Sequence, residues 1–150
     1  MLSNFKNAAI AHTSQQTVDD GAVQSVLSPE NFATARAEIT TWDGYAPTPL
    51  VKLPALAGEI GVGEILYKDE SPRFGLGSFK ALGGAYAGLR VLARQLDASM
   101  QDIRDGKYAA EVAKITLCSA TDGNHGKSLA WGANRFGCPG KIFIHAGAKR

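Results

Sequence analysis

A lysine follows a glycine-rich turn near the middle of the chain. Residues 75–84 read GLGSFKALGG, and Lys80 stands just after Ser78 and Phe79. A lysine amine must be neutral to form a Schiff base with an aldehyde, and burial and a nearby helix amino terminus both disfavour its ammonium form. We expect Lys80, at the start of a predicted helix, to experience both. Once substrate binding frees it from the Schiff base, the same amine can act as a general base. An isolated lysine here would be a solvated side chain, so the interpretation depends on a second motif.

That second motif is another glycine-rich turn, at residues 121–126, between a predicted strand and a predicted helix. Asn124 lies where parallel α/β proteins face their ligands, and its amide can donate to the phenolic oxygen of a pyridine cofactor. It can also be a plain helix cap. Asp122 fits either a turn residue or a base, and Gly123 allows close approach of a flat ring. His125 is more typical of a packed or hydrogen-bonding histidine than of a catalyst.

The stretch TDGNHGKS (121–128) also resembles a phosphate-binding P-loop, because it follows a strand and opens a helix. The P-loop pattern GxxxxGK[ST] requires glycine where Thr121 stands. Threonine does not readily supply the same backbone angle or close approach. A nucleotide-hydrolysing site is therefore disfavoured.

Composition restricts the class of protein. The 150 residues are 45% hydrophobic and 20% charged, with a net charge of +2, which is typical of a globular domain. There is no Lys/Arg run to bind nucleic acid or a membrane surface, no apolar run of transmembrane length and no signal-peptide pattern. Cys118 and Cys138 lack metal-site spacing, which predicts reduced thiols, no bound metal and a cytoplasmic location.

Apolar periodicity and turn residues predict an alternation of helices and strands. We expect a loose leader over 1–27, a helix from Pro29 to about 40, a short helix over 52–60, a strand at 65–67, a helix over 78–96, a helix over 102–113 broken at Gly106, a buried strand at 115–120, a helix capped by Asn124 and stopped at Gly137, and a buried strand at 141–145.

The last strand, helix and strand form a βαβ unit, which predicts an α/β fold with a parallel sheet and flanking helices. We divide the chain into a leader and helix (1–40) and the first part of a catalytic fold (41–150). Two or three parallel strands leave sheet edges unpaired, so we expect the natural fold to continue past residue 150.

Three stretches resemble diaminopropionate ammonia-lyase, within the fold-type II (tryptophan synthase β-like) enzymes that use pyridoxal 5'-phosphate (PLP). They are KDESPRFGLGSFKALGGAYA (68–87), TDGNHGKSLAWGA (121–133) and YAPTPL (45–50). Serine and threonine dehydratases of this group usually have an Arg-Gly-Ala-type sequence after the lysine, and Ser or Ala at position 122. Here residues 81–84 are ALGG and residue 122 is Asp, and both departures favour the ammonia-lyase.

The resemblance implies roles for individual residues. Lys80 would hold PLP as a Schiff base and take the α-proton of the L substrate, Asn124 would bond the ring hydroxyl oxygen, and Asp122 would take the α-proton of the D isomer. The remaining implied contacts are Gly123 and Phe79 with the cofactor, and Ser78, Thr121, Asp122 and His125 with the substrate.

The implied reaction is α,β-elimination of 2,3-diaminopropionate to pyruvate and ammonia, in a homodimer. Two alternatives stay open: a related PLP-dependent serine or threonine dehydratase, and a truncated, inactive fragment. In the family a phosphate-binding loop comes later in the sequence and is not found in these 150 residues. We therefore expect this chain alone to bind PLP weakly and to have little or no lyase activity.

Overall fold

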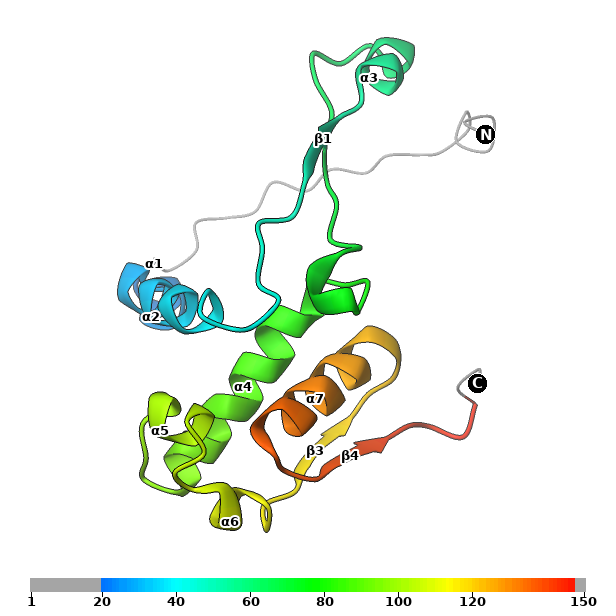
Figure 1. Ribbon diagram of the computed structural model, residues 1–150. Coiled ribbons are helices and arrows are strands. Elements are labelled where there is room, and N and C mark those ends of the chain that lie inside the picture. Colours follow the sequence, from blue (N-terminus) through cyan, green and yellow to red (C-terminus); the bar gives the residue numbers. More distant parts are fainter. Residues whose placement is uncertain (1–19, 148–150) are drawn as a thin grey trace. The chain divides into compact units, whose positions relative to one another are not determined.

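A computed structural model describes residues 20–147 (Figure 1). Its helices are α1 (Asp20–Val26), α2 (Pro29–Ile39), α3 (Pro54–Ile60), α4 (Lys80–Gln95), α5 (Met100–Arg104), α6 (Ala109–Val112) and α7 (Gly123–Phe136). Its strands are β1 (Leu50–Lys52), β2 (Leu66–Lys68), β3 (Leu117–Ala120) and β4 (Gly140–Phe143), and η2 (Arg73–Gly75) is a 3-10 turn. In the described part of the chain, no helix combines the length and the apolar character needed to cross a membrane.

The contacts divide the chain into two units, one ending at Thr34 and one beginning at Ala35. In the first unit, α1 replaces the loose leader predicted over residues 20–26, and the rest of that leader lies outside the described residues. The predicted start of α2 is confirmed. Pro29 is its first residue, and the Ser28 hydroxyl oxygen accepts the backbone N–H of Asn31 at 3.1 Å.

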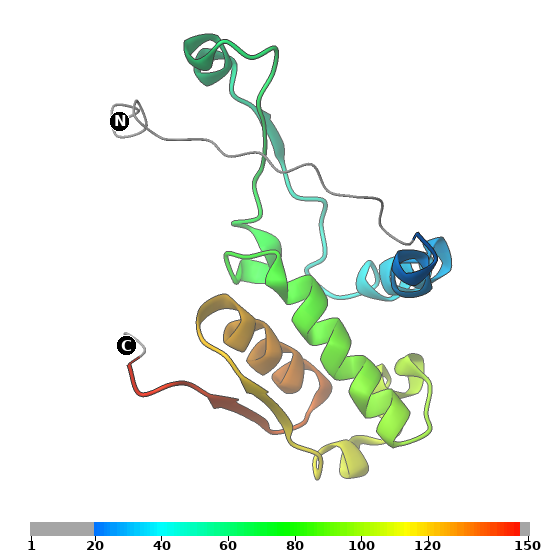
Figure 2. The ribbon, with the colours of Figure 1, turned by 180° about the vertical axis from the view of Figure 1, so that it is seen from behind.

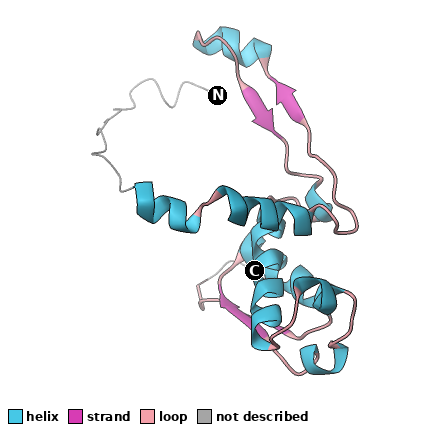
Figure 3. Ribbon diagram, turned by 90° about the vertical axis from the view of Figure 1, so that its left-hand side faces the viewer, coloured by secondary structure: helices cyan, strands magenta, loops and turns pink. Residues whose placement is uncertain are grey.

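In the second unit, β1 and β2 pair antiparallel, with Val51 opposite Tyr67 (Figure 3). The connection between them contains α3, which begins at Pro54 and ends at Ile60, and Gly61, a glycine with φ of 74°, caps its carboxyl end. The predicted helix over 52–60 is therefore too long at its start, because Lys52 pairs in a strand. The predicted strand at 65–67 is observed one residue later.

Helices α4 and α7 pack closely side by side (Figures 1 and 2). A Cβ on Gly132 would lie 2.8 Å from the Cα of Ala85, so glycine lets the two helix backbones approach. The apolar core gathers around this contact. Its buried members are Trp42, Ala85, Leu89, Leu92, Ala93, Ile103, Val112, Leu117, Leu129, Ala133, Phe136 and Cys138.

The predicted βαβ unit is confirmed: β3 and β4 are parallel neighbours, and α7 connects them. The prediction that both strands are buried is wrong. Leu117 is buried and Ser119 and Ile142 are half-buried, whereas Cys118, Ala120 and Phe143 are exposed. Exposure alternates with a period of two, so one face of this pair of strands is covered and Cys118 lies on the other.

The segment between α4 and β3 also differs from its prediction. Instead of one interrupted helix over 102–113, it forms the two short helices α5 and α6. The predicted break is confirmed at Gly106, whose φ is 75°. Ser99 caps α5, since its hydroxyl oxygen accepts the backbone N–H of Asp102 at 3.0 Å.

The contact between α4 and α7 predicts opposite effects for two Gly→Ala substitutions. Gly132→Ala should lower the free energy of unfolding by about 1–3 kcal/mol, because its methyl group would press on the Ala85 backbone. Gly83→Ala should raise it by about 0.5–1 kcal/mol, because Gly83 is exposed in α4 with nothing within 4 Å of an added Cβ. Urea unfolding of both variants measures this, and equal effects would contradict the proposed contact.

Candidate functional site

The two predicted turns lie at the same end of the α4–α7 pair. Lys80 contacts Ser128, Gly84 lies against Ser128 and Leu129, and Ala85 lies against Gly132. Residue numbers increase together along the contact, so the helices run parallel. Their amino ends therefore meet on one side, as the green and orange ribbons show (Figure 1). The structure thus brings the region of Lys80 and the turn at 121–126 to one end of the fold.

Lys80 is the first residue of α4, and its side chain is exposed. The burial predicted for this amine is therefore wrong for the chain as described. The backbone around it is held firmly. The Lys80 N–H donates to the hydroxyl oxygen of Ser78 at 3.2 Å, and the Lys80 carbonyl accepts the hydroxyl of Ser128 at 2.6 Å. A fixed backbone thus carries an exposed lysine side chain.

The turn before Lys80 depends on glycine. Gly75 and Gly77 both have φ of 69°, a left-handed conformation that side chains disfavour, and nothing lies within 4 Å of a Cβ built on either. Ser78 is buried, whereas Phe79 is 62% exposed. Ser78 therefore helps to form the turn, whereas Phe79 exposes its aromatic ring at the surface.

The second turn places its polar groups in the open. Asp122, Asn124 and His125 are exposed, and Thr121 is half-buried, with its N–H donating to the carbonyl of Phe143 at 2.9 Å. The prediction that Asn124 caps the helix is wrong. Asp122 occupies the cap position with an extended backbone, its side chain makes no capping bond, and Asn124 lies inside the first turn of α7. Both side chains are therefore free of a capping role.

An ion pair between the buried Arg73 and the half-buried Glu70 anchors the segment that leads into the Lys80 turn. Arg73 is 7% exposed, and its guanidinium donates to both carboxylate oxygens of Glu70, at 2.8 and 3.0 Å. It also donates to the carbonyl of Ala46 at 2.9 Å and to the hydroxyl of Thr48 at 3.1 Å. Thr48 in turn donates to Glu70. This network joins residues 46–48 to residues 70–73.

The network sets the charge state of its members. The hydrogen bonds from Arg73, opposed by burial and aided by the Thr48 hydroxyl, lower the pKa of Glu70 to about 2. The same carboxylate raises the pKa of Arg73. The pair is therefore fully charged at neutral pH. Sequence reasoning assigned no role to Thr48, Glu70 or Arg73, although all three lie in the quoted motifs; an Arg three residues after a Glu was the available signal.

Phe74 holds the same segment from the other side. Its φ of 49° is unusual for a residue with a side chain, and its ring lies 4.7 Å from that of Trp131 in α7 and 6.1 Å from that of Trp42. The guanidinium of Arg135 lies over both tryptophan rings. Aromatic packing against α7 thus maintains a backbone conformation just before Gly75.

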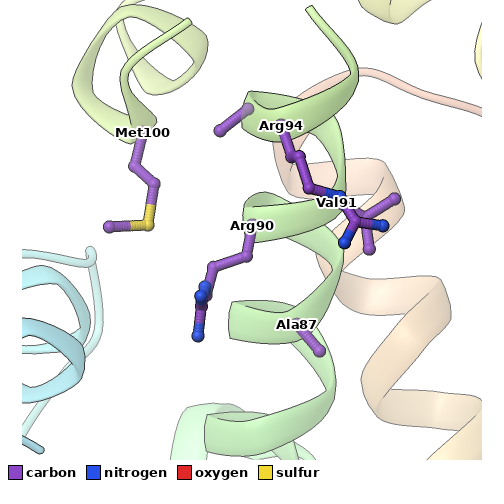
Figure 4. Close-up of a pocket in the computed structure, with 6 residues that line it drawn as sticks. Ala87, Arg90, Val91, Arg94 and Met100 are labelled. Atoms are coloured by element: carbon purple, nitrogen blue, oxygen red, sulfur yellow. The ribbon is translucent and has the colours of Figure 1, made fainter. Parts of the chain in front are cut away.

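Two surface hollows lie beside α4. One, of about 330 Å³, runs between α4 and β3 and includes His125, so His125 faces a groove shared with residues 115–119. The other, of about 460 Å³, lies farther along α4 and contains none of the predicted site residues (Figure 4). It is lined by Ala87, Arg90, Val91, Ala93, Arg94 and Met100.

The arrangement fits a flat, anionic aldehyde such as PLP. An accessible amine (Lys80) and an accessible amide (Asn124) lie at the same end of the fold. Open space surrounds Gly75, Gly77 and Gly123, the last with φ of 53°. The amino ends of two parallel helices carry partial positive charge, which favours an anionic group. The donor set and the uncovered glycines therefore match the cofactor that the resemblance implies.

Comparison with known proteins identifies the class. Residues 41–150 match the family described as "Pyridoxal-phosphate dependent enzyme". The chain therefore belongs to this family, and the predicted α/β fold class is confirmed.

The similar proteins have a common name. The diaminopropionate ammonia-lyase of Escherichia coli K12 is 42% identical over 130 residues, which are 86% of this chain and 33% of that protein. The crystal structure of the E. coli enzyme in apo form superimposes with a TM-score of 0.72 at 38% identity, covering 81% of this chain and 33% of that one. A complex of the E. coli enzyme with an aminoacrylate-PLP azomethine reaction intermediate gives 0.68 at 37% identity, covering 82% and 30%. The chain thus spans about a third of the length of these relatives.

The Glu70–Arg73 pair predicts how stability depends on pH. The pKa of Glu70 falls from 4.5 to about 2 on folding, so its stabilisation is complete above pH 4.5 and is lost as pH drops toward 2. Glu70→Gln should remove on the order of 2 kcal/mol at pH 7 and flatten the acid limb of the stability curve.

Glu64→Gln is the matched control, because Glu64 pairs with Lys52 in an exposed salt bridge and should change stability by less than about 1 kcal/mol. Urea unfolding between pH 2 and pH 7 compares the two. A Glu70→Gln curve parallel to that of the unaltered chain would contradict the assignment.

Proposed function

We propose that this chain contributes the cofactor lysine and the facing turn of a PLP-dependent enzyme that eliminates ammonia from 2,3-diaminopropionate. One observation carries the proposal: an accessible Lys80 amine, on a backbone held by Ser78 and Ser128, lies at the same end of two parallel helices as the turn at 121–126. The names of the similar proteins supply the reaction and the substrate. Asp122, where related dehydratases have Ser or Ala, favours this substrate over serine or threonine.

The residues divide the work by their chemistry. The Nζ of Lys80 would hold the cofactor covalently through its aldehyde carbon, and as a free amine it would take the α-proton of the L substrate. The Asn124 amide would donate to the ring oxygen of the cofactor, and Gly123 would let the ring approach the backbone. The Asp122 carboxylate takes the α-proton of the D isomer from the opposite face. Phe79 offers its exposed ring to the cofactor, and Ser78, Thr121 and His125 orient the substrate.

PLP, when bound, supplies the electron sink for the negative charge that develops at the substrate α-carbon. The chain supplies orientation and proton transfer. The net reaction consumes one 2,3-diaminopropionate and one water and yields pyruvate and two molecules of ammonia. The β-amino group leaves as the first ammonia, and hydrolysis of the remaining enamine nitrogen gives the second.

Two further expectations are part of the proposal. The free thiols of Cys118 and Cys138 fit a reducing compartment such as the cytoplasm. A homodimer remains the assembly we predict from the family resemblance. Sedimentation equilibrium of the enzyme measures the assembly directly.

The assignment of Lys80 is tested by trapping. The chain is incubated with PLP and reduced with borohydride, and the labelled lysines are located by mass spectrometry. We expect Lys80 to label about tenfold faster than Lys114, an exposed lysine away from both turns, because neighbouring groups orient the cofactor at Lys80. In Lys80→Arg the remaining lysines should label at the rate of Lys114. Equal labelling of Lys80 and Lys114 in the unaltered chain would reject the assignment.

The role of Asp122 is tested by isomer choice. This chain replaces the matching third of the E. coli relative, and ammonia release is measured with D- and L-2,3-diaminopropionate. Asp122→Asn should reduce turnover of the D isomer by about 100-fold, the usual size of a lost general base, and leave the L isomer within about fivefold. Retained L turnover shows that the protein is folded. Equal losses for both isomers would refute the assigned face.

A further inference from the structure

The hydroxyl of Ser128 links the two helices at the level of Lys80. Ser128 has no exposed surface, and its Oγ donates to the carbonyl oxygen of Lys80 at 2.6 Å. A serine within a helix commonly returns its hydroxyl bond to a carbonyl of its own helix. Here the bond goes from α7 to the first residue of α4. Ser128 therefore makes a direct connection between the helix of the second turn and the backbone of the lysine.

Space for this connection comes from Gly84, one turn after Lys80. A Cβ on Gly84 would lie 2.9 Å from the Cβ of Ser128 and would overlap its Oγ. Any larger residue at 84 would push Ser128 away from the Lys80 carbonyl. Gly84 and Ser128 thus form a matched pair, in which the missing side chain on one helix accommodates the hydroxyl on the other.

Ser128 lies on the same helix as Asn124 and His125, about one turn further on, and six residues after Asp122, which occupies the cap position of that helix. Because a helix holds residues a few positions apart rigidly, a bond at Ser128 also restrains the turn that precedes it. We propose that Ser128 is a positioning residue that sets the register between the Lys80 amine and the turn at 121–126. This inference rests on the proposed function, and it assigns Ser128 no contact with cofactor or substrate.

A purely structural hydroxyl would behave differently. It would stabilise the fold as any buried hydrogen bond does, and its loss would lower the unfolding temperature without changing which lysine reacts. A positioning hydroxyl also changes the selectivity for Lys80 in a protein that stays folded. Local order at the start of α4 and the labelling ratio of Lys80 to Lys114 are therefore the informative measurements.

The test compares Ser128→Ala with Ser99→Ala. The Ser99→Ala variant loses a capping bond of similar strength at the start of α5, beyond the carboxyl end of α4. It therefore controls for a general loss of stability. In the cofactor-free chain, Ser128→Ala should speed hydrogen exchange of the amides of residues 80–84 about fivefold, and Ser99→Ala should not. The Lys80 to Lys114 labelling ratio with PLP should fall about fivefold in Ser128→Ala alone, equivalent to about 1 kcal/mol for one hydrogen bond.

Ser128→Cys provides a second variant in case alanine unfolds the chain. It keeps a side chain of similar shape but donates weakly, so both readings should fall between those of the unaltered chain and Ser128→Ala. The outcomes are separable. Equal labelling of Lys80 and Lys114 in the unaltered chain rejects the proposed function. A preference for Lys80 that persists in both variants rejects the role of Ser128 alone, whether or not amide exchange changes. If the unaltered chain shows no preference for Lys80, amide hydrogen exchange still tests Ser128. Unchanged exchange at residues 80–84 in Ser128→Ala would then reject the proposed link between Ser128 and the start of α4.

Discussion

The close contact of two helix backbones is the constraint on which the rest of this structure depends. Gly132 allows α7 to lie against Ala85 of α4, and Gly84 leaves room for Ser128 to reach the Lys80 carbonyl. Small residues on both helices thus allow their close separation, and the two helices run parallel. Both amino ends then lie on one side, and the accessible side chains of Lys80, Asp122 and Asn124 follow from that geometry. The contact that packs α4 against α7 therefore also brings these polar side chains to one end of the helix pair.

A second set of contacts determines how the chain enters α4. Arg73 joins residues 46–48 to Glu70 through partly buried, charge-assisted hydrogen bonds, and Phe74 packs its ring on Trp131. Burying a guanidinium is costly unless its donors find partners, and here a carboxylate, a carbonyl and a hydroxyl accept them. The unusual φ of Phe74 is held by this surrounding packing. The glycine turn that follows therefore starts from a fixed point, and bonds to Ser78 and Ser128 hold the Lys80 backbone at its other end.

Local sequence signals predicted where helices and strands begin and end better than they predicted which residues are buried. Proline at position 29 and glycine at positions 106 and 137 determine φ or remove a donor, and the structure has breaks or caps there. The parallel pairing of β3 and β4 followed from a strand, a helix and a strand in succession. Burial could not be read the same way. An apolar run such as that around Cys118 predicts a covered strand, but the coverage depends on elements distant in sequence. Exposure of Lys80 and the network of Arg73 were missed for the same reason, because both depend on tertiary partners.

The helix cap shows why a residue type alone does not settle its role. Asparagine and aspartate are both good caps, and the sequence has one of each within three residues at the start of α7. The structure places Asp122 at the cap position without using its carboxylate, and it leaves the Asn124 amide exposed in the first turn. A capping bond would have occupied either side chain. Because neither forms one, both polar groups remain exposed at the turn, as the proposed contacts with cofactor and substrate require. The hydrogen bond from the Thr121 N–H to the Phe143 carbonyl holds the turn instead. Structural support therefore comes from the main chain, and the side chains of Asp122 and Asn124 stay exposed.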